Sequence, residues 1–151
     1  MHVRTWQAAY AHVFGARRLA TIDLDARTAG WRERLAEPDP SHTVLVGEDD
    51  GSVVAFAWCG ESRDSADEGE LYAIYALPEA WGSGAGPALI ARTLEALRAG
   101  GYAEASLWVL EDNPRARRFY EREGWRPDGG QREETFLGVP VREVRYRIAL
   151  R

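Results

Sequence analysis

The stretch WGSGAG at residues 81–86 places three glycines within five positions, directly before a run whose apolar residues recur at helical spacing. The first N–H groups of a helix have no intrahelical partner, and the helix dipole puts partial positive charge at the same end. Because glycine carries no side chain, several N–H groups can converge on one anion. The stretch is compatible with a phosphate-binding loop and with a glycine-rich turn that binds nothing.

Two better-known phosphate loops are excluded by the sequence. The loop GxxxxGK[ST] needs a lysine, and all nineteen basic residues of the chain are arginine. The dinucleotide fingerprint GxGxxG needs another spacing, because Gly82, Gly84 and Gly86 read GxGxG. Pro87 then fits the first turn of the helix, where proline is tolerated and its fixed φ favours helix initiation.

Hydrophobic periodicity divides the chain into the helices and strands that would hold this loop. Two β-rich runs flank the turn signal Glu-Asp-Asp-Gly at 48–51, which is typical of a hairpin. The predicted order is two helices, three meandering strands, a helix, a strand, a helix and two strands. In residue ranges, these elements are 3–14, 25–37, 42–62 as two strands, 69–78, 87–102, 105–113, 114–124 and 134–150 as two strands.

This order predicts an α/β fold of the mixed α+β type. We expect a central mixed sheet, mostly antiparallel, flanked by about four helices and containing at least one strand–helix–strand crossover. The length of 151 residues and the apolar content of 45% fit a single domain over residues 1–151.

Composition narrows the partners and the chemistry. A net charge of −5 argues against a nucleic-acid partner, and the absence of lysine removes Schiff-base chemistry. No apolar run approaches membrane-spanning length, and the lone Cys59 forms no internal disulfide, so we expect a cytoplasmic protein without a membrane partner. His2, His12 and His42 lack metal-ligand spacing, so no metal is expected.

At this point the sequence resembles the GNAT superfamily of N-acetyltransferases, in its bacterial type, over nearly the whole chain. The family signature is Gln or Arg, two residues, Gly, any residue, then Gly or Ala, and residues 81–86 match it from Gly84 onward. The downstream run EDNPRARRFYEREGW is similar to a second signature, in which an asparagine at a helix start and a tyrosine seven residues later meet acetyl-coenzyme A. Here these are Asn113 and Tyr120.

The chain departs from the family pattern in two places. Trp81 stands where the signature prefers Gln or Arg, which weakens a side-chain contact but leaves the backbone N–H groups. Family members also begin with a strand before the first helix, and this sequence starts inside that helix. We therefore expect the neighbouring strand edge to be covered by a compensating element or by a second copy in a homodimer.

The resemblance implies that acetyl-coenzyme A is the co-substrate and that no metal takes part. A strand edge would bind the pantetheine arm, the glycine loop would bind the pyrophosphate, and the second signature would complete the site. The residues expected along the cofactor are Ile74, Tyr75, Ala76, Gly82, Ser83, Gly84, Ala85, Gly86, Pro87, Asn113 and Tyr120.

The implied reaction is direct attack of an amine on the acetyl thioester. An alkylammonium has a pKa near 10.4, so only roughly one molecule in a few thousand carries a free lone pair at neutral pH, and a base is needed. Glu70 is the first candidate base, with Glu111 or a water chain as alternatives and Tyr72 as a proton relay. Tyr120 is the candidate acid toward the departing thiolate, and we expect Tyr120 to face the cleft and Phe119 the core.

The acceptor would be an amine on a small molecule or a protein, and the sequence does not identify it. Its pocket would lie between the first two helices and the last hairpin. An alternative function is that of a non-catalytic acyl-coenzyme A binding module with the same fold. The aromatic residues that could line the pocket, or equally belong to the core, are Trp6, Tyr10, Trp31, Tyr72, Trp108 and Phe136.

Overall fold

The computed structural model describes residues 1–150 of the chain. It contains six α-helices, one short 3-10 helix and six strands. Their bounds in chain order are α1 (His2–Ala9), α2 (Ala11–Phe14), α3 (Ala16–Leu19), α4 (Leu24–Ala36), β1 (His42–Asp49), β2 (Ser52–Glu61), β3 (Gly69–Ala76), η1 (Pro78–Ala80), α5 (Ala85–Ala99), β4 (Glu104–Leu110), α6 (Pro114–Arg122), β5 (Arg126–Phe136) and β6 (Val139–Ala149).

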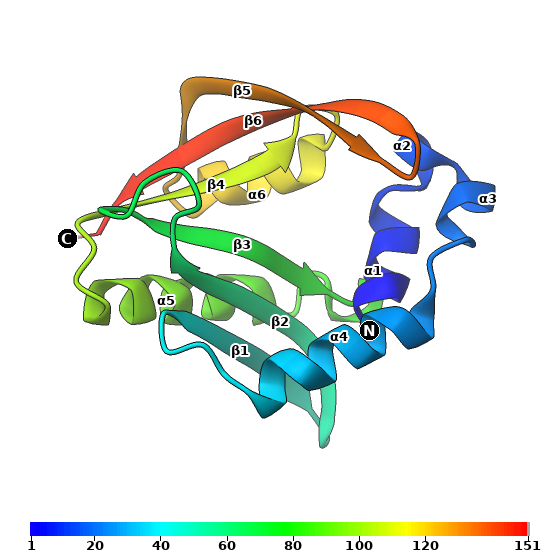
Figure 1. The fold of residues 1–151 in the computed structure, drawn as a ribbon, viewed down its shortest axis with the longest axis horizontal. Helices are drawn as coiled ribbons and strands as arrows, with labels where there is room; N and C mark the ends of the chain where they lie inside the picture. Colours follow the sequence, from blue (N-terminus) through cyan, green and yellow to red (C-terminus); the bar gives the residue numbers. More distant parts are fainter. Residues whose placement is uncertain (151) are drawn as a thin grey trace.

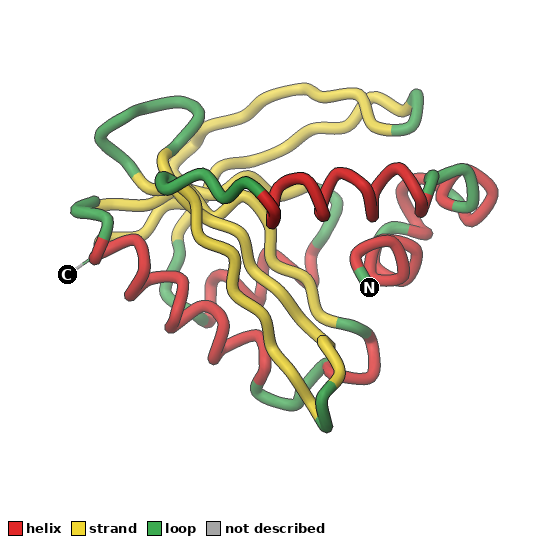
Figure 2. Tube along the Cα trace, turned by 60° about the horizontal axis from the view of Figure 1, so that its bottom comes forward, coloured by secondary structure: helices red, strands yellow, loops and turns green. Residues whose placement is uncertain are grey.

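All six strands form one sheet in the order β1-β2-β3-β4-β6-β5. Every neighbouring pair is antiparallel except β3 and β4, which are parallel and are joined by the crossover through η1 and α5. Helices α5 and α6 lie behind the sheet in Figure 1, and α4 lies in front of it; Figure 2 shows the same separation after rotation. The predicted mixed, mostly antiparallel sheet is confirmed.

The main core lies between the sheet and α5. Alternate residues of β2, Ala55, Ala57 and Cys59, face this side and are almost completely buried with Leu89 and Ile90 of α5. Alternation arises because successive side chains of a strand point to opposite faces. The intervening positions of β2 therefore face α4 and are free to line a different surface.

Strands β3 and β4 pair over only two residues and then separate. Gly69 lies opposite Ala105 and Glu70 opposite Ser106, after which the two strands diverge, as Figure 1 shows. The pairing of β3 with β2 shifts at this point, so that Tyr72 is an extra residue in β3. A bulge of this kind bends the strand that carries it. The bend leaves the β4-facing edge of β3 without a strand partner beyond Glu70.

The N-terminal helices are more broken than predicted. The expected helix 3–14 is divided at Tyr10, whose φ of −115° and ψ of 11° lie outside the helical region, and the short α3 was not predicted. The second helix begins at Leu24, one residue earlier than expected, because Asp23 caps it by accepting a hydrogen bond from the Ala26 N–H at 2.9 Å. Six α-helices thus replace the expected four.

Strand β5 is longer than predicted. It begins at Arg126, whereas the sequence placed the strand from residue 134 because Pro127 and Gly129-Gly130 are typical of a loop. The structure accommodates these residues as a bulge against β6, between Pro127 and Gln131. The tight turn to β6 has positive φ at Leu137 and Gly138, the conformation of a two-residue hairpin loop.

Strand β1 forms one edge of the sheet, and no strand within residues 1–150 covers its outer side. The described chain enters α1 at His2 without a preceding strand. In the same range, no helix has both the length and the apolar character needed to cross a lipid bilayer.

We predict that Gly60→Ala destabilises the fold by about 1–3 kcal/mol. A Cβ at Gly60 would overlap the Ser41 carbonyl oxygen and would lie 2.7 Å from the His42 ring, so β1 would have to move. Gly30→Ala is the matched control, because its Cβ would meet nothing within 4 Å in α4 and alanine favours a helix by about 0.5–1 kcal/mol. Urea unfolding of both variants should give changes of opposite sign; a neutral Gly60→Ala would contradict the close β1–β2 contact.

Candidate active site

The glycine loop lies at the open end of the β3–β4 separation, between η1 and α5. Gly82 and Gly84 have φ of 77° and 89°, a region that favours glycine, and Gly84 is the N-cap of α5. Among residues 1–150, no protein acceptor takes the N–H of Gly82 or of Gly84. The loop therefore presents free N–H groups at a helix N-terminus, which is the geometry of an anion site. Pro87 lies in the first turn, as predicted.

Helix α6 packs directly against the start of α5. A Cβ at Gly86 would lie 3.1 Å from the Phe119 ring, so glycine is needed for this close approach. Asn113 caps α6 by accepting a hydrogen bond from the Ala116 N–H at 3.2 Å, and its side chain is buried. The two signature segments of the sequence therefore meet at one place in the fold.

Trp81 connects the glycine loop to β3 and to α6. Its indole Nε1 donates a hydrogen bond to the Ala76 carbonyl at the end of β3, at 2.8 Å. The guanidinium of Arg115, from the first turn of α6, lies 3.2 Å from the centre of the indole ring. Arg115 adds a positive charge beside the glycine loop, and it is exposed and has no carboxylate partner within the described chain.

Three tyrosine hydroxyl groups come together on the α1 side of the separation. The ring of Tyr120 is buried in the main core beside Trp125, and burial, with Tyr75 nearby, raises its pKa. Burial also raises the pKa of Tyr10, and electrostatic interaction with Tyr75 and Tyr120 raises it further. All three phenols therefore remain protonated at neutral pH and can donate hydrogen bonds.

The expected orientation of the pair Phe119 and Tyr120 is wrong. Tyr120 is the buried residue of the two, at 9% exposure, and Phe119 is the partly exposed one that packs on α5. The reason is that the α6 face toward the sheet is set by Tyr120, which also contacts Tyr146 of β6. Only the hydroxyl end of Tyr120 is near the other phenols.

Glu70 is completely buried at the point where β3 and β4 separate. Its carboxylate is held by Arg63, through the guanidinium and through the backbone N–H at 2.9 Å. This contact raises the pKa of Arg63. The Ser106 hydroxyl, opposite Glu70 in the strand pairing, is buried and has no hydrogen-bond partner among the described residues. A buried polar atom of this kind is a position for water or for a bound ligand.

The alternative proton carriers lie in different surroundings. The Tyr72 hydroxyl donates a hydrogen bond to the Glu61 carbonyl, and burial raises the pKa of Tyr72. Glu111 is exposed just after β4, and its backbone carbonyl accepts a hydrogen bond from Arg117 at 3.1 Å. Neither side chain is brought to the Glu70 and Ser106 position by a contact in the structure.

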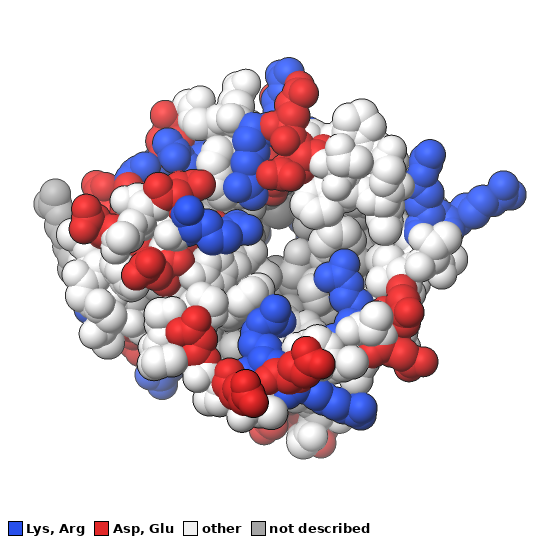
Figure 3. Space-filling view, viewed as in Figure 1, with Lys and Arg blue, Asp and Glu red and all other residues white. Residues whose placement is uncertain are grey.

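The face of the sheet toward α1 and α4 is aromatic and open. Figure 3 shows this face with a hollow near its centre, between the strands β1–β3 below and β4–β6 above, and charged side chains around it. All six candidate pocket aromatics belong to this face or to the helices over it, and each is partly exposed. They are Trp6, Tyr10, Trp31, Tyr72, Trp108 and Phe136.

These aromatics fall into two groups. Trp6, Tyr10 and Phe136 pack with Phe14 in a cluster beneath the last hairpin. Trp31 and Trp108 instead contact arginine side chains. Arg34 lies over Trp31 and over its neighbour Trp58, and Arg132 lies over Trp108.

Sequence reasoning missed the arginines of the site, Arg34, Arg63 and Arg115. Nineteen arginines spread over the chain give no signal that separates these three from the rest. Arg63 lies in the loop between β2 and β3, so no helical or strand periodicity relates it to Glu70. Within residues 1–150, no group of three or more His, Cys, Asp or Glu side chains is arranged to hold a metal ion.

A mixed sheet that opens between two parallel strands, with a glycine loop and a helix N-terminus at the opening, is the architecture of the GNAT fold. The chain belongs to the Acetyltransferase (GNAT) family, whose model matches residues 5–125. The family prediction from the two sequence signatures is confirmed.

Relatives from several organisms support this membership. An uncharacterized N-acetyltransferase of Bacillus subtilis, YuaI, is 34% identical over 117 residues, which cover 76% of this chain and 65% of YuaI. The mycothiol acetyltransferase of Streptomyces griseus is 39% identical over 123 residues, covering 79% of this chain but 36% of that protein. The chain thus spans between about a third and two thirds of the length of these two relatives.

Solved structures share the fold at low sequence identity. The Salmonella typhimurium protein yncA, solved with acetyl-CoA, superposes with a TM-score of 0.70 at 22% identity, over 99% of this chain and 87% of that one. The paia N-acetyltransferase of Thermoplasma acidophilum, in complex with coenzyme A, gives 0.67 at 16% identity, over 97% and 87% of the two chains.

Proposed function

We propose that the protein is an N-acetyltransferase that transfers the acetyl group of acetyl-coenzyme A to a primary amine of a small molecule or a protein. The observation that carries this proposal is the free N–H groups of Gly82 and Gly84, at an α5 N-terminus that faces the unpaired edge of β3. Family membership and the cofactors named for two neighbours of the same fold support it.

The residues at the opening fit coenzyme A. Residues 82–87 would hold the pyrophosphate, since the N–H groups of Gly82 and Gly84 are free and Arg115 adds positive charge beside them. The β3 edge at Ile74, Tyr75 and Ala76 would bind the pantetheine amides. The Ala76 carbonyl already accepts a hydrogen bond from the Trp81 indole. On this proposal, that hydrogen bond is either retained or replaced by one from the cofactor.

Acetyl-coenzyme A would supply an activated acyl carbon and a thiolate leaving group. Tyr120 would donate a hydrogen bond to the sulfur, because its hydroxyl stays protonated in its buried surroundings. A coenzyme thiol has a pKa near 8.5, below that of the phenol, so Tyr120 stabilises the thiolate chiefly by hydrogen bonding. Asn113, buried beside the phenols at the α6 start, would orient the same end of the site.

Glu70 would serve as the base, through water. Its carboxylate is buried where the strands separate, and the unpartnered Ser106 hydroxyl opposite it provides an anchor for a bridging water. Arg63 keeps the carboxylate in place and compensates its charge in the interior. Glu111 remains the alternative, as an exposed carboxylate at the end of β4.

The proposal is tested by free-thiol release from acetyl-coenzyme A with purified protein and a panel of primary amines. We expect turnover with at least one amine and a rise in melting temperature with coenzyme A alone. A thermal shift without turnover on any amine would favour the non-catalytic binding module. The absence of both would contradict the cofactor assignment.

For the acid, we predict that Tyr120→Phe lowers kcat by roughly ten- to a hundredfold, the range for a lost hydrogen bond to a charged group. The binding of coenzyme A should change little, because the phenyl ring keeps its packing against Trp125 and Tyr146. Steady-state kinetics with calorimetric binding measures both. Unchanged kcat would remove Tyr120 from the mechanism.

For the base, we predict that Glu70→Gln lowers kcat/KM on the order of a hundredfold or more at neutral pH and moves its pH profile upward. The amine must then lose its proton to bulk solvent before it binds. Glu111→Gln, an exposed substitution, is the matched control and should leave the profile unchanged.

The variant Arg63→Gln distinguishes two roles of Glu70, that of a base and that of a partner in a structural ion pair. It leaves the carboxylate and its backbone hydrogen bond from residue 63 in place but removes the guanidinium. If Glu70 is the base, Arg63→Gln retains activity at neutral pH where Glu70→Gln loses it. Equal loss in both folded variants, with the same pH profile, would show that only the ion pair matters.

A further inference from the structure

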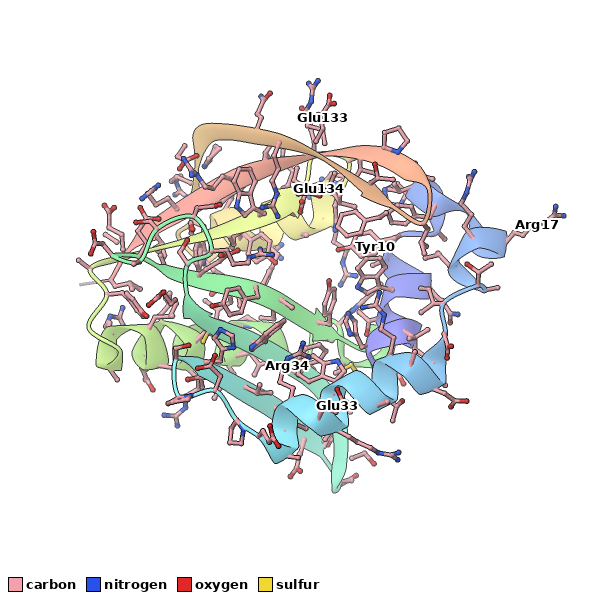
Figure 4. The ribbon with its side chains drawn as sticks, viewed as in Figure 1. Tyr10, Arg17, Glu33, Arg34, Glu133 and Glu134 are labelled. Atoms are coloured by element: carbon pink, nitrogen blue, oxygen red, sulfur yellow. The ribbon has the colours of Figure 1, made fainter. Side chains whose placement is uncertain are left out.

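Arg34 lies against two tryptophan rings on the open face of the sheet. Its guanidinium carbon is 4.7 Å from the ring centre of Trp31 in α4 and 4.2 Å from that of Trp58 in β2. Figure 4 shows Arg34 reaching from α4 toward the strands, whereas Arg17 extends away from the molecule. The two indoles fix the guanidinium by cation–π contact.

The guanidinium of Arg34 lies against two indole rings that meet edge to face, and its N–H groups have no protein acceptor among the described residues. Within residues 1–150, Arg34 makes no ion pair and no side-chain hydrogen bond, although the residue is partly buried. Stacking uses the planar faces, while the N–H groups at the edge are the donors that match a carboxylate. Arg34 is thus held by its two aromatic contacts, and its donors remain available.

The arginine on the opposite wall shows the contrast. Arg132 lies 4.3 Å from the ring centre of Trp108, and it is also paired with Glu143, whose oxygen lies 3.0 Å from Nε. Arg63, near the ring of Tyr72, is paired with Glu70. Of the arginines over aromatic rings on this face, Arg34 is the one without a carboxylate in the described chain.

The charge around Arg34 reinforces the need for an anion. Arg27 lies two helical turns earlier in α4, on the same face, and forms no ion pair among the described residues. The pKa of His2 is lowered to about 4, by burial first and then by Arg27, the N-terminal amine and Arg34. His2 is therefore neutral at pH 7 and adds no charge. Glu33 on α4 and Glu37 at its C-cap are both exposed, and neither pairs with Arg34.

The position of Arg34 connects it to the proposed reaction centre. The Trp58 ring is 4.8 Å from the Tyr72 ring, and Tyr72 is the extra residue of β3, two positions after Glu70. Arg63 lies 5.6 Å from the same Tyr72 ring. One row of neighbouring side chains thus runs from Arg34 past two aromatic rings to Arg63 and the buried carboxylate.

We infer that the acceptor is a small amine that also carries a carboxylate or another oxyanion, which binds to the edge of Arg34. This inference rests on the proposed acetyltransferase activity. The amine would lie toward Glu70, and the body of the acceptor would lie against Trp58 and Tyr72. An oxyanion on the acceptor would supply the partner that the chain itself does not give Arg34.

The test compares amino acids with their primary amides, and with aminoalkyl phosphonates, as acceptors for the full-length protein. For each pair, the ratio of kcat/KM for the acid to that for the amide is measured in wild type and variants, so that differences in amine pKa cancel. We expect Arg34→Gln to lower this ratio by roughly ten- to a hundredfold, because kcat/KM falls for the acid and stays unchanged for the amide. Arg34→Lys should restore it only in part, since lysine lacks the planar edge and stacks less well.

Arg32→Gln is the matched control, because Arg32 is exposed on the same helix and contacts neither tryptophan. It should leave the ratio unchanged. An unaltered ratio in folded Arg34→Gln, or a wild-type preference for amides and diamines, would overturn the inference while acetyl transfer itself persists. Loss of turnover on every acceptor in wild type would instead contradict the proposed activity. The aminoalkyl phosphonates show whether a tetrahedral oxyanion can replace the planar carboxylate at Arg34.

Discussion

The separation of β3 from β4 after two paired residues is the feature on which the site depends. A parallel pair that continued would bury the β3 edge in backbone hydrogen bonds and leave no opening beside the glycine loop. The bulge at Tyr72 bends β3 directly after Glu70, so the last paired position and the buried carboxylate coincide. The same bend turns Tyr72 toward Trp58 and away from regular alternation. Backbone geometry thus places the opening, the carboxylate and the aromatic wall together.

Ion pairs connect the segments at the end of the sheet where β3 and β4 are still paired. Arg147 of β6 pairs with Glu68, before β3, with Glu104 at 3.2 Å, at the start of β4, and with Asp128 at 3.2 Å in β5. Asp128 also accepts from Arg145 at 2.7 Å. These contacts tie four segments at the end where β3 and β4 meet, and a network of partly buried pairs is worth more than isolated surface pairs. The strands therefore diverge from a fixed point.

The sequence could predict the elements whose signals are local. The hairpin at 48–51, the α6 cap at Asn113 and the glycine loop all follow from short-range chemistry, and the structure contains them. It could not predict the break at Tyr10 or the early start of β5, because both depend on packing between distant segments. The bulge at Tyr72 and the partners of Arg34 and Arg63 have the same origin: each is set by a residue from another element. The chemical role of Glu70, Asn113 and Tyr120 stays a prediction from the family resemblance.

The protonation of the site follows from burial rather than from specific partners. Tyr10, Tyr75 and Tyr120 all have raised pKa values, and burial is the first cause in each case. A group of neutral phenols can stabilise negative charge on a sulfur by hydrogen bonding without carrying charge itself. The arginines without a carboxylate partner in the described chain lie instead at the two ends of the site, Arg115 beside the glycine loop and Arg34 on the α4 side, whereas the charge of Arg63 is balanced by Glu70. On the proposed function, this distribution leaves the centre neutral, so that an amine can lose its proton there, and places positive charge where the anionic ends of both substrates would bind.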